Sequence, residues 1–219
     1  IAGIGEYEKK SMPAFDLWHE IVNKKVTEPE LSEITDVDEP AAIIYTSGTT
    51  GNPKGVTLSH RNLTSNTQSV IEYLGLTYKD SIVSVLPFYY SFGNSVMHTH
   101  LAVGGKLVLE YNFMYPHKTL EKMVEEKVTG FSGVPSTYAL LLSRTKLKEY
   151  DFSKLRYVTQ AGGAMPPASI KRFLEEMSEV DFYVMYGQTE GTARLSYLSP
   201  EDLINKMGSI GKAIPGVTL

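Results

Sequence analysis

Short apolar runs alternate with amphipathic helical stretches along most of the chain, and this alternation narrows the possible folds more than any other property of the sequence. The predicted strands are 41–46, 81–87, 106–110, 128–134, 155–162 and 180–187. The predicted helices between them are about 60–73, 92–103, 117–127, 136–144 and 167–178. Strands that alternate with helices through short loops form a mainly parallel sheet flanked by helices. The sequence therefore predicts an α/β fold.

The boundaries of this pattern divide the chain into two parts. The strand runs are continuously apolar, as expected when helices cover both faces of a sheet. Residues 1–40 are less regular and are interpreted as a connecting segment from an earlier subdomain, with a helix near 15–25. Residues 41–219 are predicted to form the α/β subdomain.

The composition excludes several classes of function. The chain has 219 residues, 42% of them hydrophobic and 21% charged, which is typical of one large globular domain. A formal net charge of −4 argues against a nucleic-acid or membrane-surface binder. The chain has no Cys, which excludes disulfides, thiolate metal sites and a cysteine nucleophile. No signal peptide and no transmembrane segment are recognised, so we expect a cytoplasmic protein.

A loop rich in glycine and hydroxyls, YTSGTTGNPKGVTLSH, spans residues 45–60. It is predicted to leave a buried strand and to enter a helix that begins near Ser59; ligands of such sheets bind beyond the carboxyl ends of the strands. Inward N–H groups, hydroxyls and the charge of Lys54 together suit a polyphosphate. A surface turn is the plain alternative. The spacing matches neither a Walker loop nor a dinucleotide-binding fingerprint.

Two further segments lie where predicted strands end. Gly162 and Gly163 lack a Cβ, so a flat base could approach the backbone there, although a helix-entry turn explains them equally well. Tyr186 offers an aromatic face, and Glu190 offers a carboxylate that suits Mg²⁺ beside phosphates. A core tyrosine and a solvated glutamate are the alternatives, and Thr189 could equally cap a turn.

Several of these strings resemble motifs of one family. YTSGTTGNPKG (45–55) resembles the phosphate-loop signature of the acyl-adenylate-forming (AMP-binding) superfamily, of the acyl-CoA synthetase or acid–thiol ligase type. YGQTE (186–190) resembles its adenine and magnesium motif, QAGGAM (160–165) its adenine-pocket glycines, and GSIGKAIPGV (208–217) a later glycine-rich segment. LPFYYSFG (86–93) resembles the aromatic motif of the acyl pocket, and GVPSTYALLL (133–142) the helix beside it. The chain thus resembles a central fragment of the family's large N-terminal domain.

The resemblance implies a binding site for ATP and Mg²⁺. The implied phosphate-binding residues are Thr46, Ser47, Gly48, Thr49, Thr50, Gly51 and Lys54. The implied adenine-binding residues are Gly162, Gly163, Ala164, Tyr186 and Gly187. Thr189 is implied to contact the α-phosphate or the substrate carboxylate and Glu190 to bind Mg²⁺; with Thr46 and Lys54 they form the implied catalytic set. The implied substrate pocket consists of Tyr89, Tyr90, Phe92, Gly93, Val134 and Pro135.

The resemblance also implies an activity. The family activates a carboxylic acid, here fatty or aryl, with ATP to an acyl-adenylate, and then transfers the acyl group to a thiol of coenzyme A or of the phosphopantetheine on an acyl-carrier protein. Negative charge develops on the leaving pyrophosphate, so donors and a cation placed beforehand are the main catalytic resource. Two other functions stay open: an ATP hydrolase with an unrelated phosphate loop, and a non-catalytic nucleotide-binding or interaction module.

The chain departs from the family pattern at three places. Tyr90 stands where the aromatic motif usually carries a histidine, and tyrosine cannot become a cation near neutral pH. Gly93 stands where peptide synthetases carry an aspartate that holds an amino group, which counts against an amino-acid substrate. The chain ends at Leu219, before the family's ribose-binding aspartate and its C-terminal domain. We therefore expect the chain to be inactive by itself.

Overall fold

The computed structural model describes residues 36–46, 52–110 and 112–219. The chain divides after Val37, and the fold described below is that of the unit Asp38–Leu219. The helix predicted near 15–25 lies outside the described residues, as do residues 47–51 of the predicted phosphate loop.

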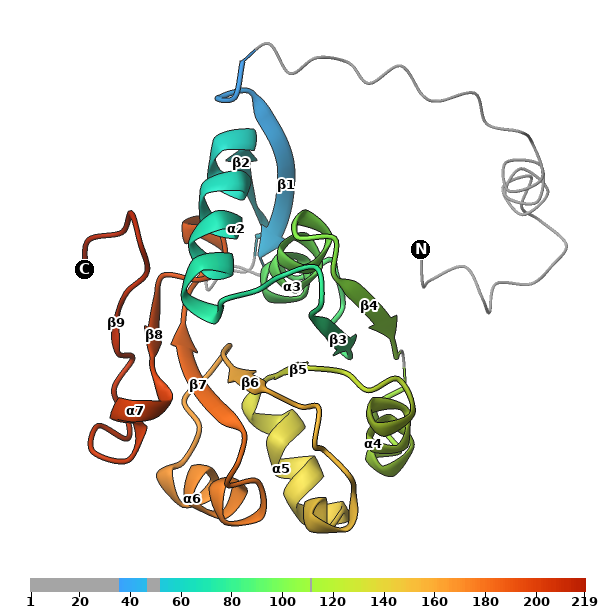
Figure 1. Ribbon diagram of the computed structural model, residues 1–219. Coiled ribbons are helices and arrows are strands. Elements are labelled where there is room, and N and C mark those ends of the chain that lie inside the picture. The colour runs from blue at the N-terminus through green and yellow to red at the C-terminus, as the bar shows by residue number, and fades with distance from the viewer. Residues whose placement is uncertain (1–35, 47–51, 111) are drawn as a thin grey trace, which may run out of the picture. The chain divides into compact units, whose positions relative to one another are not determined.

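A seven-stranded sheet is the centre of this unit (Figure 1). Its first five strands are parallel, and the last two are antiparallel to their neighbours. In spatial order the strands are β4 (Lys106–Leu109), β3 (Ser81–Ser84), β5 (Gly130–Gly133), β6 (Tyr157–Gln160), β7 (Asp181–Tyr186), β8 (Ser196–Leu198) and β9 (Lys212–Ala213). The predicted mainly parallel sheet is confirmed, whereas β8 and β9 were not predicted.

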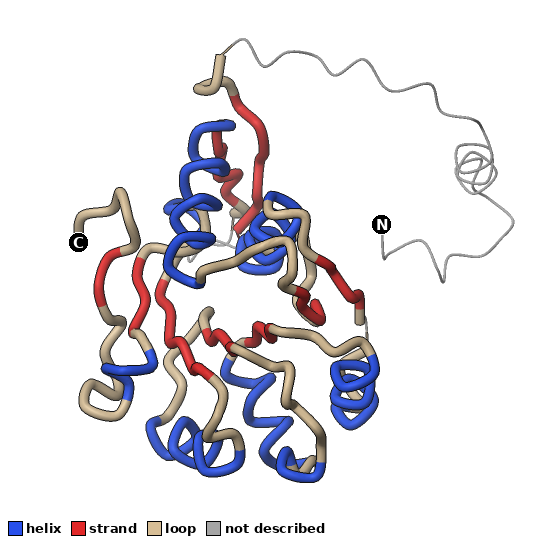
Figure 2. The backbone as a smooth tube through the Cα atoms, viewed as in Figure 1, coloured by secondary structure: helices blue, strands red, loops and turns tan. Residues whose placement is uncertain are grey.

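Helices cover both faces of the sheet, and each of the five helices predicted between residues 60 and 178 is present with its ends within two residues. Figure 2 shows helices on both sides of the strands, with α4, α5 and α6 on one side and α2 and α3 on the other. The helices are α2 (His60–Leu74), α3 (Ser91–Ala102), α4 (Pro116–Glu125), α5 (Pro135–Arg144), α6 (Pro167–Glu176) and the short α7 (Pro200–Leu203), with 3₁₀ turns η1 (Leu147–Glu149) and η2 (Thr189–Gly191). None of the helices in the described ranges is long and apolar enough to span a membrane.

The first predicted strand, 41–46, is present at the predicted position, but it does not belong to the seven-stranded sheet. β1 (Pro40–Thr46) pairs antiparallel with β2 (Lys54–Ser59) in a separate two-stranded sheet. Ile43 and Tyr45 are 58% and 70% exposed, whereas the alternate residues Ala42, Ile44 and Thr46 are partly buried. The prediction of a buried strand is therefore wrong: only one face of β1 is covered, and a run that is apolar on both faces hides this alternation. The second half of the predicted loop is strand β2.

Ser59 begins helix α2, as predicted. Its hydroxyl accepts a hydrogen bond from the Asn62 N–H at 3.2 Å, and the Asn62 side chain accepts one from the Ser59 N–H at 2.9 Å. This reciprocal pair satisfies two backbone donors that a helix start would otherwise leave unpaired. The hairpin is thus joined to α2 through a fixed cap.

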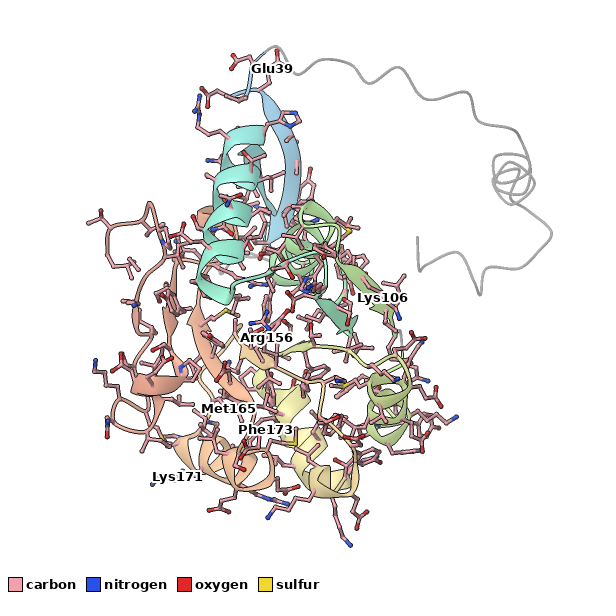
Figure 3. The ribbon with its side chains drawn as sticks, viewed as in Figure 1. Glu39, Lys106, Arg156, Met165, Lys171 and Phe173 are labelled. Carbon is pink, nitrogen blue, oxygen red and sulfur yellow. The ribbon has the colours of Figure 1, made fainter. Side chains whose placement is uncertain are left out.

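Two apolar clusters fix the sheet between its helices. The larger one lies on the side of α4, α5 and α6, where the Tyr138 ring packs 5.4 Å from both Phe173 and Phe182. Figure 3 labels Phe173 and Met165, which both belong to this cluster. The smaller one joins Val70 and Leu74 of α2 to Tyr157 of β6. Apolar burial of this kind contributes about 25 cal/mol per Å² and holds the strand ends in place.

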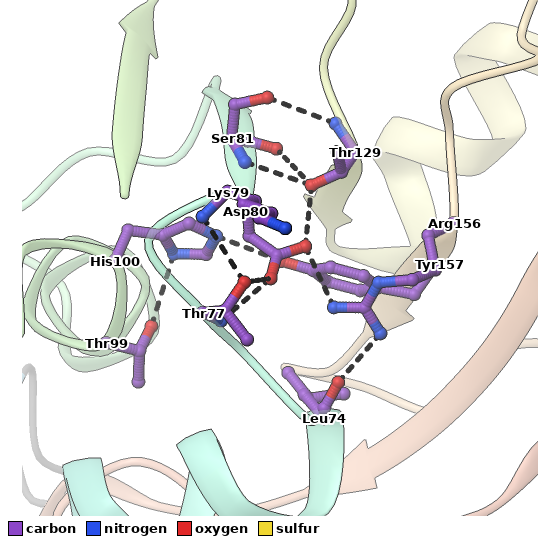
Figure 4. A network of polar contacts seen from close by, with 10 residues as sticks. All are labelled: Leu74, Thr77, Lys79, Asp80, Ser81, Thr99, His100, Thr129, Arg156 and Tyr157. Carbon is purple, nitrogen blue, oxygen red and sulfur yellow. Dashed lines mark hydrogen bonds and ion pairs between the residues drawn. The ribbon is translucent and has the colours of Figure 1, made fainter. Parts of the chain in front are cut away.

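A polar network ties together the starts of the strands (Figure 4). The Asp80 carboxylate accepts hydrogen bonds from Arg156 Nη2 and Thr129 Oγ1, each at 2.9 Å, and from the Thr77 N–H at 2.8 Å. Arg156 also donates to the Leu74 carbonyl at 2.8 Å, which connects the network to the end of α2. Because Asp80, Thr129 and Arg156 directly precede β3, β5 and β6, the network fixes the register of these strands at their amino ends.

Candidate functional site

The predicted site residues outside the hairpin follow strands that are neighbours in the sheet. β3, β5, β6 and β7 are adjacent and parallel, so their carboxyl ends meet at one edge. The segments 86–93, 134–135, 162–164 and 186–190 come after these four strands in turn. This edge is where open α/β sheets bind their ligands.

A tight turn after β6 brings two of these segments into contact. The Gln160 side-chain amide donates to the Gly163 carbonyl at 2.7 Å, and Gly162 has a φ of +81°, which favours glycine. A Cβ on Gly162 would lie 3.1 Å from Val134, and one on Gly163 would lie 3.4 Å from Pro135. The glycines implied to hold adenine thus lie against residues implied to line the acid pocket.

The turn after β7 has a constrained backbone. A Cβ on Gly187 would overlap the carbonyl oxygen of Ala193, so the close return of the chain requires glycine there. Thr192 and Ala193 have φ values of 58° and 82°, which are costly for residues with a side chain. The Leu195 N–H donates to the Tyr186 carbonyl at 2.9 Å and closes the turn, leaving Tyr186 40% exposed. Strained backbone of this kind is commonly found at functional sites.

Thr189 in this turn touches the aromatic segment and lies beside the hairpin. Its Oγ1 is 3.3 Å from the hydroxyl of Ser91, the first residue of α3. The turn η2, which carries Thr189 and Glu190, packs against β2, the strand that begins with Lys54. Sequence reasoning missed Ser91 because a serine at a helix start is usually only a cap.

The aromatic segment presents exposed rings beside a buried glycine. Tyr89 and Tyr90 are 71% and 59% exposed, and their ring centroids are 4.5 Å apart. Phe92 is partly buried. A Cβ on Gly93 would overlap the carbonyl oxygen of Pro87, so the packing of the helix start requires glycine at this position. An aspartate could not occupy position 93 without moving the backbone.

A cleft of about 270 Å³ lies beside Glu190. Its walls come from one polar face of α2, from the turn after β7 and from the last glycine-rich segment. The lining residues are Asn62, Ser65, Asn66, Ser69, Glu190, Gly191, Thr192, Ile214, Pro215, Gly216 and Val217. Sequence reasoning missed the α2 face, although small polar residues at intervals of three and four are the signal of a polar helix stripe.

The chemistry of these residues fits ATP and Mg²⁺. Exposed glycines at 162 and 163, together with the exposed face of Tyr186, leave room for a flat base. Within the described ranges no group of three or more His, Asp or Glu side chains could hold a metal ion. A Mg²⁺ ion at the exposed Glu190 would therefore need phosphate oxygens or water as its other ligands, as is common for Mg²⁺ with nucleotides. Ser47, Gly48, Thr49, Thr50 and Gly51 lie outside the described residues.

A model of the AMP-binding enzyme family matches residues 5–219. The mitochondrial medium-chain acyl-CoA ligase ACSF2 of Rattus norvegicus is 34% identical over 184 residues, which are 81% of this chain and 30% of that protein. The 2-succinylbenzoate–CoA ligase of Listeria monocytogenes is 34% identical over 206 residues, which are 90% of this chain and 41% of that protein.

Solved structures give the same result. O-succinylbenzoate coenzyme A synthetase from Bacillus subtilis, in complex with ATP and magnesium, matches with a TM-score of 0.78 and 29% identity over 90% of this chain and 40% of that one. The N-terminal domain of FACL13 from Mycobacterium tuberculosis matches with a TM-score of 0.79 and 27% identity over 87% and 47%. The chain spans 30% of the length of ACSF2 and 41% of the length of the Listeria monocytogenes ligase. The chain therefore belongs to the AMP-binding, acyl-adenylate-forming enzyme family, with the fold of part of its N-terminal domain.

Proposed function

We propose that this chain is the ATP- and acid-binding part of an AMP-forming acid–thiol ligase. The observation that carries the proposal is the meeting of four strand-end segments at one edge of the sheet, with Thr189 3.3 Å from Ser91 of the aromatic segment. The segments that we assign to the nucleotide and to the acid would thereby be neighbours, as a reaction between an acid and ATP requires. The kinship with CoA ligases supports this assignment.

The first half-reaction joins the acid to the nucleotide. A carboxylate oxygen attacks the α-phosphorus of ATP, the bond from that phosphorus to the bridging oxygen breaks, and pyrophosphate leaves. Lys54 and the loop after Thr46 would hold the β- and γ-phosphates, and Thr189 would donate to the α-phosphate. Glu190 would hold Mg²⁺, which when bound neutralises charge on the phosphates. Donors and cations in fixed positions stabilise the charge that develops on pyrophosphate.

The second half-reaction moves the acyl group to sulfur. A thiol attacks the acyl carbonyl carbon, and AMP leaves with the electrons of the broken carbon–oxygen bond. The names of the relatives favour coenzyme A as the thiol, and the phosphopantetheine of a carrier protein is the alternative.

ATP–pyrophosphate exchange in the complete protein that contains this chain tests the proposal. A panel of carboxylic acids of varied length and aromaticity is expected to include one that drives exchange. Thr189→Val and Glu190→Gln should each lower that exchange by about 100-fold, since each removes an interaction with charge that develops in the transition state. Ser143→Ala, which removes an exposed hydroxyl on α5, is the matched control and should leave exchange unchanged. Mg·ATP binding without exchange for any acid would instead indicate a non-catalytic nucleotide-binding module.

The isolated 219-residue chain is proposed to bind Mg·ATP weakly and not to turn over. The chain spans less than half the length of the relatives above, so contacts that the rest of such proteins make with ATP would be missing. Losing part of a preorganised set of donors costs several kcal/mol of transition-state stabilisation. Rapid pyrophosphate exchange by the isolated chain would contradict this proposal.

A further inference from the structure

Arg194 directs its side chain into the interior at the end of the strained turn after β7. It is only 2% exposed and is the largest of the fully buried side chains. Its backbone carbonyl accepts a hydrogen bond at 2.7 Å from the side chain of Asn66, which is itself buried on α2. The positive φ values of Thr192 and Ala193 directly precede it, so the costly backbone of the turn serves to direct this residue inward.

The guanidinium of Arg194 is only partly paired: the neutral Tyr73 hydroxyl hydrogen-bonds with it but cannot balance its charge. Its Nε and Nη1 atoms are buried without a hydrogen-bond partner. None of the ion pairs found in the described part of the chain includes Arg194. Its Cζ lies 5.3 Å from the centre of the Phe92 ring, a contact that offsets only part of the cost of burying a cation. A buried, incompletely paired arginine is expensive, and such a group usually has a function.

The groups around Arg194 do not balance its charge. Burial is the main cause that lowers the pKa of His100 to about 4, and the charge of Arg194 acts in the same direction, so His100 is neutral at pH 7. Asp80 acts on His100 and Tyr157, but its carboxylate already lies 2.9 Å from Arg156. The region beneath α3 thus holds one unbalanced positive charge.

This charge lies directly behind the segment assigned to the acid. Phe92 belongs to the proposed acid pocket and is partly exposed, and the guanidinium lies under its ring. One turn further along α3, the buried hydroxyl of Ser95 also lacks a hydrogen-bond partner. Ser95 lines a cavity of about 10 Å³ together with Asn66 and with Thr192, which lies two residues before Arg194. Because the Phe92 ring lies over the guanidinium, a ligand coming from the proposed acid pocket would have to displace this ring to reach Arg194.

We propose that Arg194 selects the acid by binding a second carboxylate at its far end, so that the site activates a dicarboxylic acid in preference to a plain fatty acid. The inference rests on the function proposed above. An apolar tail cannot satisfy a buried guanidinium, whereas a carboxylate accepts two parallel hydrogen bonds from it and balances its charge. The paired side chains His100 and Tyr157 fill part of the layer beneath α3, which favours a short acid over a long one.

The test compares acids of equal length in the complete protein. Pyrophosphate exchange is measured with glutarate, adipate and suberate against pentanoate, hexanoate and octanoate, for the wild type, Arg194→Met and Arg194→Lys. In the wild type, kcat/KM should favour the best dicarboxylate about 100-fold over the monocarboxylate of equal length, and Arg194→Met should abolish that preference mainly through KM. Arg194→Lys should keep about a tenth of it, since lysine retains the charge without the fork geometry. Arg172→Met is the control, because it removes a more exposed arginine of α6. It should leave kcat/KM unchanged for both the dicarboxylates and the monocarboxylates.

Thermal unfolding separates substrate recognition from structural support. Without ligand, Arg194→Met should unfold at the same temperature as the wild type or a few degrees higher, because an apolar side chain of similar length replaces an incompletely paired cation. Adding adipate should raise the unfolding temperature of the wild type and not of Arg194→Met. Equal losses for mono- and dicarboxylates together with a large fall in unfolding temperature would show that Arg194 only supports the fold and would overturn the proposal.

The two proposals fail in different ways. Exchange that is driven only by monocarboxylates supports the proposed ligase function and overturns the role of Arg194. No exchange with any acid overturns the ligase function, and the adipate-dependent unfolding temperature then decides by itself whether Arg194 forms an anion site.

Discussion

At the amino ends of the parallel strands both oxygens of Asp80 accept hydrogen bonds, and the arginine that pairs with it also reaches a backbone carbonyl and stacks on Tyr157 at 4.8 Å. At the carboxyl ends the buried arginine Arg194 has unpaired nitrogens, and the turn before it has two residues with positive φ. At the amino ends of the strands the buried polar groups are therefore paired within the protein. At the carboxyl ends the unpaired guanidinium and the positive φ values carry a free-energy cost, which a bound ligand could offset. The difference agrees with the proposal that ligands bind at the carboxyl ends of the strands, while the amino ends stabilise the fold.

The largest effect is expected from Gly187→Ala at the carboxyl end. The new Cβ would overlap the backbone carbonyl of Ala193, and a backbone atom cannot move aside as a side chain can. We expect the free energy of unfolding to fall by about 3–5 kcal/mol and nucleotide binding to be lost, because the turn that carries Thr189 and Glu190 must change.

Urea denaturation and ATP titration measure the effects of Gly187→Ala. Gly75→Ala is the control, because Gly75 has a φ of +59° but no atom within 4 Å of the added Cβ, and it should cost only about 1 kcal/mol. If both variants unfold at the same urea concentration, the close return of the chain at Gly187 is not what holds the turn.

Arg156→Met removes the ion pair with Asp80 at the amino ends of the strands and is the counterpart of Arg194→Met at the carboxyl ends. It leaves the Asp80 carboxylate, whose side chain is 7% exposed, without its charged partner. Breaking a fully buried pair costs about 3–5 kcal/mol; because Arg156 is 39% exposed, we expect about 2–4 kcal/mol. Urea denaturation of both variants measures the comparison directly: the same substitution should destabilise at position 156 and not at 194. Equal destabilisation would remove the distinction between the two ends.

Acidification should weaken the region between the two arginines. Burial lowers the pKa of His100 to about 4, while an unfolded histidine titrates near 6.5. The unfolded chain therefore takes up a proton that the folded one does not, and stability should fall by about 1–2 kcal/mol as the pH drops from 7 to 5. Burial raises the pKa of Asp80, but hydrogen bonds from Arg156, Thr77 and Thr129 outweigh it and leave that pKa lowered. Protonation of Asp80 therefore lowers the stability only below about pH 4.

Denaturation of wild type and His100→Gln at pH 7 and 5 isolates the contribution of His100. The variant should have the flatter dependence on pH. His98, whose pKa burial also lowers, acts in the same direction, so His98→Gln is the matched comparison and should flatten the curve less. An identical slope in wild type and His100→Gln would assign the pH dependence elsewhere.

Periodicity predicted the parallel strands and the helices because each of them buries a continuous apolar run or stripe. It failed at β1, whose two faces are both apolar in sequence although Ile43 and Tyr45 face outward. It also missed β8 and β9, which have three and two residues and are too short to show a period. A hairpin that packs on helices rather than in the sheet depends on tertiary contacts that no local pattern encodes.

The motifs predicted which segments meet at the edge of the sheet, since parallel strands place their carboxyl ends together. They did not predict Ser91, Asn66 or Arg194, because each acquires its role from a partner distant in sequence: Asn66 and Arg194 are separated by 128 positions. A charged residue within the strand-like run ARLSYL was the one available signal for Arg194. The roles of 47–51 and of the remaining site residues stay predictions.

The smallest effect is expected from Ser91→Ala, which removes the hydroxyl that links the acid segment to Thr189. The two oxygens are 3.3 Å apart and only part-buried, so the pair contributes at most about 1 kcal/mol. We expect stability to change by less than about 0.5 kcal/mol and the KM for the acid to rise about threefold at unchanged Mg·ATP affinity, because the pair positions one segment against the other. Steady-state exchange kinetics with the acid and ATP varied in turn measure the split. A rise confined to the KM for ATP would mean that Ser91 serves the nucleotide side and does not position the acid segment.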